Sequence, residues 1–157
     1  MRRSIEVLVA DKRWTQHPRV VKQVARAASL ARARAPARSE NGAITILLAS
    51  DSRLRALNAH FRGKDTATNV LAFPASRQRD LYIGDVAIAY GVAMREARES
   101  KKPLEAHAAH LAVHGVLHLL GFDHETAKQA KTMEAIEISV LSAMRIPDPY
   151  RSRAERA

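Results

Sequence analysis

Three histidines in the second half of the chain have the spacing of a metal site. His114 and His118 are four residues apart, and His124 follows after Gly121. Residues four apart on a helix leave the same face about 6 Å apart, so two imidazoles can reach one ion. Gly121 permits the left-handed backbone that ends a helix and turns the chain back. A straight helix cannot supply three histidines to the tetrahedron that zinc prefers, so the third ligand must come from beyond the turn. The spacing therefore predicts one Zn²⁺ ion on His114, His118 and His124.

Two further histidines share the expected helix and offer a rival ligand set. His107 and His110 fall on the same helical stripe as His114 and His118. A site built from His110, His114 and His118 is disfavoured, because its outer members lie about 12 Å apart along the axis. His107 and His110 are therefore interpreted as core histidines that bond to carbonyls and neighbours, with a ligand role as the alternative.

Composition favours a cytoplasmic protein with a single domain. The chain has 157 residues, 46% of them hydrophobic, which predicts one domain over 1–150 and a polar C-terminal tail over 151–157. It has no cysteine, so imidazole and carboxylate are its metal-binding chemistry. Its apolar runs are too short for a signal peptide or a membrane span, so we expect a cytoplasmic location and no membrane partner.

Positive charge is concentrated in the first part of the chain. Residues 1–64 hold 14 of the 26 Lys and Arg residues but only 4 of the 16 Asp and Glu residues, and the net charge is +10. This asymmetry predicts one positive surface for a polyanion, with nucleic acid ahead of anionic lipid. The alternative interpretation is an ordinary solvated surface.

The expected elements define an α+β protein. Apolar residues recur with helical spacing over 18–35, 51–60, 91–99, 104–120 and 127–143. Short apolar runs predict strands over 5–10, 43–49, 70–73 and 81–90, the last interrupted at Gly84-Asp85 by a bulge or turn. Loops are expected over 36–42, 61–68 and 74–81. Strands that come early and helices that come late predict a small sheet covered by helices, with 104–120 as a buried helix.

Short motifs follow one another in order from about residue 43 to residue 150. They are Leu57-Asn58, Arg62-Gly63-Lys64-Asp65, Thr68-Asn69-Val70-Leu71-x-Phe73-Pro74, Gly84-Asp85, Lys102-Pro-Leu-Glu-Ala-His107, His114 to His124, Met133-Glu134-Ala135-x-Glu137 and Asp148-Pro149-Tyr150. Together they resemble the YbeY family of bacterial endoribonucleases, the rRNA maturation factors. The chain departs from the family pattern at Ala72, where serine is usual, and at Phe122, where tyrosine is common.

The resemblance implies both a fold and an activity. It implies a small mixed four-stranded sheet packed with about five or six helices, with one zinc ion on a central buried helix and the loop after it. It further implies single-stranded RNA as substrate, a part in 16S ribosomal RNA maturation and ribosome quality control, and the small ribosomal subunit and assembly factors as partners. DNA is not expected as a substrate. The functional arginine of the family maps onto Arg62.

Three protein nitrogens leave a fourth zinc position open, which is the pattern of catalytic rather than structural zinc. We expect His114 and Arg62 to serve catalysis, Arg62 by binding the charge that builds on the phosphate. Lys64 and Asn69 are further candidates for substrate binding, although Asn69 is equally suited to holding its own loop.

Three acidic residues near the histidines have open interpretations. Asp123 either accepts a hydrogen bond from a histidine ring or caps the following helix. Glu134 and Glu137 either reach the site or face solvent, and solvent is favoured.

Two other functions fit parts of the sequence. The spacing His-x-x-x-His followed by Gly-x-x-His occurs in metzincin proteases, but these enzymes place a glutamate directly after the first histidine, where this chain has Gly115. The second alternative is a non-catalytic ribosome assembly factor whose zinc only stabilises the fold. A cleavage assay on single-stranded RNA with zinc-ligand variants separates these alternatives.

Overall fold

The sheet is built from four strands and is mixed. The computed structural model describes residues 4–35, 42–75 and 82–151. The strands are β1 (Ile5–Val9), β2 (Ala43–Ala49), β3 (Val70–Pro74) and β4 (Tyr82–Ala89), in the order β1-β2-β4-β3. β2 pairs in parallel with β1 and β4, whereas β3 is antiparallel to β4. The prediction of a small mixed four-stranded sheet is confirmed.

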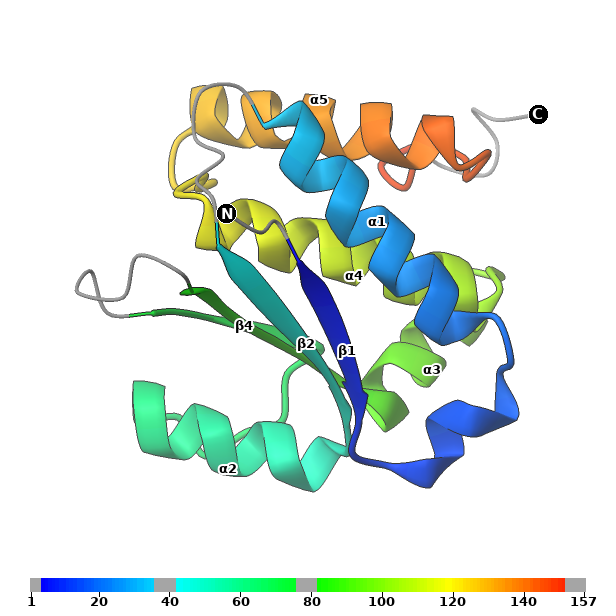
Figure 1. Cartoon of the computed structure of the whole chain (residues 1–157), viewed down its shortest axis with the longest axis vertical. Helices are drawn as coiled ribbons and strands as arrows, with labels where there is room; N and C mark the ends of the chain where they lie inside the picture. Colours follow the sequence, from blue (N-terminus) through cyan, green and yellow to red (C-terminus); the bar gives the residue numbers. More distant parts are fainter. Residues whose placement is uncertain (1–3, 36–41, 76–81, 152–157) are drawn as a thin grey trace.

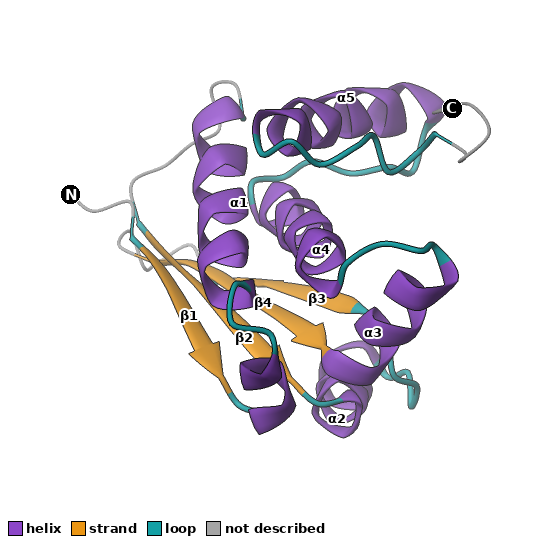
Figure 2. Cartoon of the chain, turned by 90° about the vertical axis from the view of Figure 1, so that its right-hand side faces the viewer, coloured by secondary structure: helices purple, strands orange, loops and turns teal. Residues whose placement is uncertain are grey.

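Helices cover both faces of this sheet. They are α1 (Val20–Arg34), α2 (Asp51–Arg62), α3 (Tyr90–Glu99), α4 (Leu104–Leu119) and α5 (Ala127–Ala143), with a 3₁₀ helix, η1 (Lys12–Gln16), after β1. α1 and α4 pack on one face, α5 packs on both of these helices, and α2 packs on the opposite face (Figures 1 and 2). α4 thereby lies between the sheet and α5, which confirms the central helix of the predicted α+β fold.

α4 lies close to the sheet because one of its residues has no side chain. A β-carbon at Gly115 would come within 2.6 Å of Val86 Cγ1 in β4 and 3.3 Å of Val70 Cγ2 in β3. The helix is apolar around most of its surface, as expected for an element covered on several sides. Gly115 therefore sets the distance at which the histidines of α4 stand above β3 and β4.

The turn after α4 forms as the sequence predicts. Gly121 has φ +95°, in the left-handed region that glycine adopts without strain. Its N–H donates to His118 O at 3.0 Å, and the N–H of Phe122 donates to Leu117 O at 3.0 Å. This pair of bonds is a Schellman motif, which satisfies the last carbonyls of the helix and reverses the chain. α5 then begins at a capping box formed by Thr126 and Gln129.

Most predicted elements are found, with differences at particular ends. Strand 43–49 and helix 127–143 have the predicted bounds. α2 continues past the predicted end at residue 60, so Arg62 ends a helix instead of lying in a loop, and left-handed Gly63 stops it. β4 runs through Gly84-Asp85 without a break, and its pairing with β2 skips Ile83, so the predicted irregularity is a bulge. η1 was not predicted, because a 3₁₀ helix of five residues is too short to show a period.

Some predictions fall on parts of the chain that the structure does not describe. They are most of the loop over 36–42, the loop between Pro74 and the predicted start of β4 at Leu81, and the C-terminal tail from residue 152 onward. Within residues 4–35, 42–75 and 82–151, no helix is both long and apolar enough to span a membrane.

Candidate metal centre

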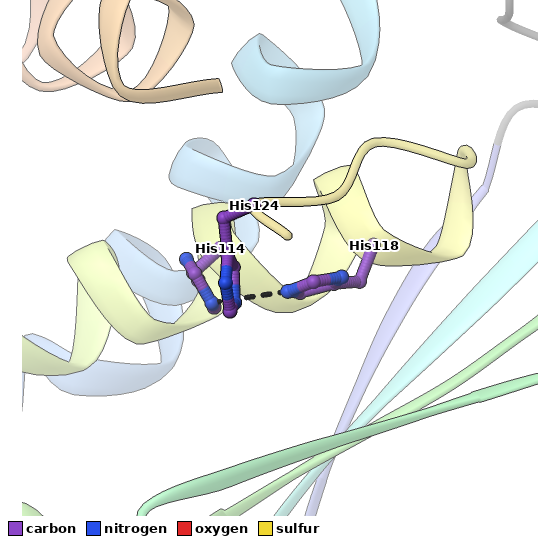
Figure 3. A group of neighbouring side chains, drawn as sticks. All are labelled: His114, His118 and His124. Atoms are coloured by element: carbon purple, nitrogen blue, oxygen red, sulfur yellow. Dashed lines mark hydrogen bonds between the residues drawn. The ribbon is translucent and has the colours of Figure 1, made fainter. Parts of the chain in front are cut away.

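The three predicted ligands converge at the C-terminal end of α4. His114 and His118 project from successive turns of the helix, and His124 comes back over them from the segment beyond Gly121 (Figure 3). Each residue offers one ligand nitrogen, and these nitrogens all lie within 4.8 Å of one another. His114 Nε2 and His118 Nε2 are 3.2 Å apart. A tetrahedral ion with bonds of about 2.05 Å would separate its ligand nitrogens by about 3.3 Å, so the His114–His118 separation fits such an ion and the trio could hold a metal.

Glu137 of α5 supports the centre from behind. Its side chain is fully buried, and its Oε2 lies 2.6 Å from His114 Nδ1. An ionised carboxylate can only accept, so the Nδ1–H of His114 donates and the Nε2 lone pair faces the other two rings. The favoured prediction that Glu137 faces solvent is wrong. The same face of α5 carries Met133, Val140 and Leu141, and this apolar spacing of three and four residues was the signal in the sequence.

The second carboxylate oxygen of Glu137 has partners of its own. Glu137 Oε1 accepts a hydrogen bond from the Tyr150 hydroxyl, and His110 Nε2 lies 3.5 Å away. Burial raises the pKa of Glu137, but the hydrogen bonds from His110, His114 and Tyr150 outweigh burial and lower it to about 2. Burial and the hydrogen bond to Glu137 raise the pKa of Tyr150. The carboxylate is therefore held ionised, as its contact with a ligand histidine requires.

His110 and His118 differ in their surroundings. His110 Nε2 is also 3.3 Å from the Tyr150 hydroxyl, so its partners are neighbouring side chains, as the core-histidine interpretation predicts. Among the described residues, the one group able to hold a metal ion is His114, His118 and His124, without His110. Burial, followed by the charges of His114 and His124, lowers the pKa of His118. A neutral ring is the form that binds a metal ion.

The acidic residues near the trio are now placed. Asp123 Oδ1 accepts the backbone N–H of His124 at 2.7 Å, and the cap of α5 is Thr126 rather than Asp123. Glu134 is half-buried and lines a cavity of about 290 Å³ behind the trio, together with Glu137 and Tyr150. Glu134 therefore borders the centre but does not belong to its three-nitrogen set.

A cleft of about 850 Å³ joins the trio to other predicted site residues. Its lining includes all four histidines of the α4 stripe, with Arg62 from the end of α2 and Asn69 from the residue before β3. Lys64 is exposed and is not among the residues that line this cleft. The cleft also contains Glu96 of α3, which the sequence did not single out.

The basic first part of the chain contributes little directly to the cleft. Within its described portion, Arg62 is the one Lys or Arg among the lining residues. Arg32 is buried, and Arg13 and Arg55 pair with Asp11 and Asp65. A single positive surface for a polyanion stays a prediction.

Fold and site together define an α+β protein with a candidate three-histidine metal centre in an open cleft. A family model described as Endoribonuclease YbeY matches residues 8–145. The chain therefore belongs to the YbeY family.

Relatives agree with this assignment, and a solved structure agrees with the fold. A protein named Endoribonuclease YbeY from a Bradyrhizobium strain is 40% identical, with 96% of this chain and 94% of the relative covered. One of the same name from Maricaulis maris is 42% identical, over 94% and 91% of the two chains. A solution structure from Thermotoga maritima matches with a TM-score of 0.56 at 23% identity, over 94% of this chain and 99% of that one, which supports the fold.

Proposed function

We propose that this protein is a zinc-dependent endoribonuclease that cleaves single-stranded RNA. The observation that carries the proposal is the convergence of His114, His118 and His124 in a cleft that also contains Arg62. Three protein nitrogens with one open position are typical of catalytic zinc. The names of the relatives support RNA as the substrate. The family further supports a role in 16S ribosomal RNA maturation and ribosome quality control in the cytoplasm, with the small ribosomal subunit and assembly factors as partners.

The candidate site residues have different tasks in this proposal. A bound zinc ion would supply Lewis acidity that polarises a phosphoryl oxygen or activates the nucleophile. Glu137 holds the tautomer of His114, and the buried surroundings of His118 keep its ring neutral. Arg62 binds the scissile phosphate, because its planar guanidinium matches phosphate oxygens and stays charged. Lys64 and Asn69 contact other parts of the same RNA strand.

The packing of Gly115 disfavours the protease alternative. A metzincin has a glutamate at this position, and even the β-carbon of such a residue would lie 2.6 Å from Val86 Cγ1. The general base of that mechanism has no room in this fold.

Metal analysis combined with RNA cleavage tests the proposal. We expect about one zinc per chain, cleavage of a single-stranded RNA by the wild type, and loss of both in His114→Ala with an unchanged circular dichroism spectrum. Arg62→Ala should retain zinc but lose cleavage. Unfolding of the zinc-free protein, with no cleavage by the loaded wild type, would instead support the non-catalytic assembly factor.

A further inference from the structure

Three polar side chains form a cluster in the cleft about two helical turns from the metal centre. Glu96 Oε1 lies 2.8 Å from His107 Nε2, and Asn69 Nδ2 lies 3.1 and 3.3 Å from the two oxygens of Glu96. His107 precedes His114 by seven residues, about 10 Å along α4. All three line the cleft, and they come from three separate segments: the residue before β3, α3 and α4. None of them contacts the three metal-ligand histidines through a hydrogen bond of the described structure.

The carboxylate of Glu96 decides how its two partners are oriented. An ionised carboxylate can only accept hydrogen bonds, so Asn69 must turn its amide nitrogen toward Glu96. The carbonyl oxygen Oδ1 of Asn69 is then the polar end left for another partner. His107 must likewise donate through Nε2, which leaves its Nδ1 without a proton.

The state of His107 agrees with this arrangement. Its Nδ1 is buried and has no hydrogen-bond partner in the described structure. Burial lowers the pKa of His107 although Glu96 acts to raise it, so the ring stays neutral. A buried nitrogen without a proton is less costly than a buried N–H without an acceptor. His107 therefore acts as a fixed donor that anchors Glu96.

The remaining acceptor on Asn69, a half-buried residue that lines the cleft, favours certain groups of an RNA strand. Phosphate oxygens are acceptors and cannot pair with a carbonyl oxygen, and the charge of Glu96 repels them. The donors of a single strand are the ribose 2′-hydroxyl and the N–H groups of the bases. The hydroxyl occurs at every nucleotide of RNA and at none of DNA.

We propose that Glu96 is a positioning residue that presents Asn69 Oδ1 as an acceptor for the ribose 2′-hydroxyl, so that this end of the cleft distinguishes RNA from DNA. The inference rests on the proposed function and extends it to a residue of α3. Arg62 then holds phosphate and Asn69 holds sugar along one strand.

Binding of uridine and deoxyuridine oligonucleotides tests the proposal. The two strands carry the same base, so a difference in their affinities reports the 2′-hydroxyl rather than a base N–H. Binding is the suitable readout, because removal of the hydroxyl would also stop cleavage if that hydroxyl were the nucleophile. We expect the wild type to bind RNA roughly 2- to 10-fold more tightly, as one hydrogen bond allows.

Variants at the cluster should remove this preference selectively. In Glu96→Gln the new amide both donates and accepts, so Asn69 is no longer held in one orientation and the RNA-to-DNA affinity ratio should fall toward one. Asn69→Ala should do the same, whereas Glu96→Asp should retain part of the ratio. Glu6→Gln, on the exposed face of the distant strand β1, is the matched control and should keep the full ratio.

A second readout does not depend on RNA. The nitrogen chemical shifts of the His107 ring should show the neutral Nε2–H tautomer at neutral pH. An Nδ1–H tautomer or a charged ring would overturn the positioning by Glu96.

Failure of this inference differs from failure of the proposed function. If the wild type cleaves single-stranded RNA but binds both oligonucleotides equally, only the inference is overturned. It is also overturned if the preference survives in Glu96→Gln and Asn69→Ala. If the wild type neither binds nor cleaves RNA, the proposed function fails and the inference falls with it.

Discussion

Two histidines of α4, His107 and His114, each contact a glutamate from a neighbouring helix, yet the two pairs differ in what they leave free. Glu137 accepts a hydrogen bond from Nδ1 of His114, so Nε2 faces the other two rings of the trio. Glu96 accepts a hydrogen bond from Nε2 of His107, so the buried Nδ1 has no hydrogen-bond partner in the described structure. The ring nitrogen that the carboxylate contacts therefore determines which nitrogen of each histidine is left without a proton, and only that of His114 faces the other two rings of the trio.

The two glutamates also differ in burial, and this separates their tasks. The side chain of Glu137 is 0% exposed, whereas that of Glu96 is 35% exposed. A fully buried carboxylate can act only through the groups that touch it, here His114, His110 and Tyr150. A carboxylate in an open cleft can also orient a neighbouring side chain toward the substrate. Here Glu96 accepts from Asn69 Nδ2, and Asn69 Oδ1 is the atom that we propose contacts the RNA. The first pair belongs to the candidate metal centre, and the second lines the cleft in which we propose that the substrate binds.

The largest effect on metal affinity is expected when one of the three candidate ligand rings is removed, and no effect is expected when His107 is removed. His118→Ala should lose more metal affinity than the roughly 10- to 100-fold that loss of an outer partner costs, because two rings cannot hold the ion firmly. His107→Ala should keep the metal content of the wild type. Elemental analysis after dialysis against a weak chelator measures both. Equal loss of metal in the two variants would end the distinction between the two histidines.

A smaller effect is expected when the carboxylates are exchanged for amides. Glu137→Gln should weaken metal binding by about 10- to 100-fold, because His114 loses the charged partner that fixes its tautomer and raises its basicity. Glu96→Gln should leave the metal affinity unchanged. Competition with a fluorescent zinc indicator gives both constants. A metal affinity of Glu137→Gln equal to that of the wild type would show that the buried carboxylate does not support the centre.

The close approach of α4 to the sheet can be tested through Gly115. Gly115→Ala should lower the free energy of unfolding by about 1–3 kcal/mol, because its β-carbon would lie 2.6 Å from Val86 Cγ1. The shift of α4 should disturb the adjacent His114 more than the distant His107. Urea unfolding measures the stability, and ring nitrogen shifts report the two histidines. A loss below about 0.5 kcal/mol would mean that α4 moves away freely.

The smallest effect is expected from the protonation of His107. Burial lowers its pKa below the ordinary 6.5; Glu96 acts to raise it, and His110 and Lys102 act to lower it. The unfolded chain therefore binds the proton more readily, so the stability from neutral His107 is present above pH 6.5 and declines as the pH falls below that value. In His107→Gln this part of the pH dependence should disappear. Urea unfolding of both metal-free proteins between pH 5 and 8 measures the difference, and parallel curves would contradict the buried neutral ring.

Local patterns in the sequence were sufficient for much of the fold and for the metal ligands. β2 is rich in Ile and Leu, and α5 has the bounds that its helical spacing predicts. The three ligands follow from one helical turn and one left-handed glycine. These features depend on residues within about ten positions of one another, so the backbone geometry of a helix and a turn is enough to predict them.

The partners of the histidines were decided by the tertiary structure. Glu137 was expected in solvent but is buried, because α5 packs against α1 and α4. The sequence does not reveal this packing. Asn69 precedes β3, whereas Glu96 lies in α3 and His107 in α4, and no spacing along the chain relates the three residues. Arg62 reaches the cleft only because α2 ends beside the edge strand β3. The sequence alone determined which rings can meet, whereas the packing of distant helices determined which ring nitrogen each carboxylate occupies, since that packing is a long-range property of the folded chain.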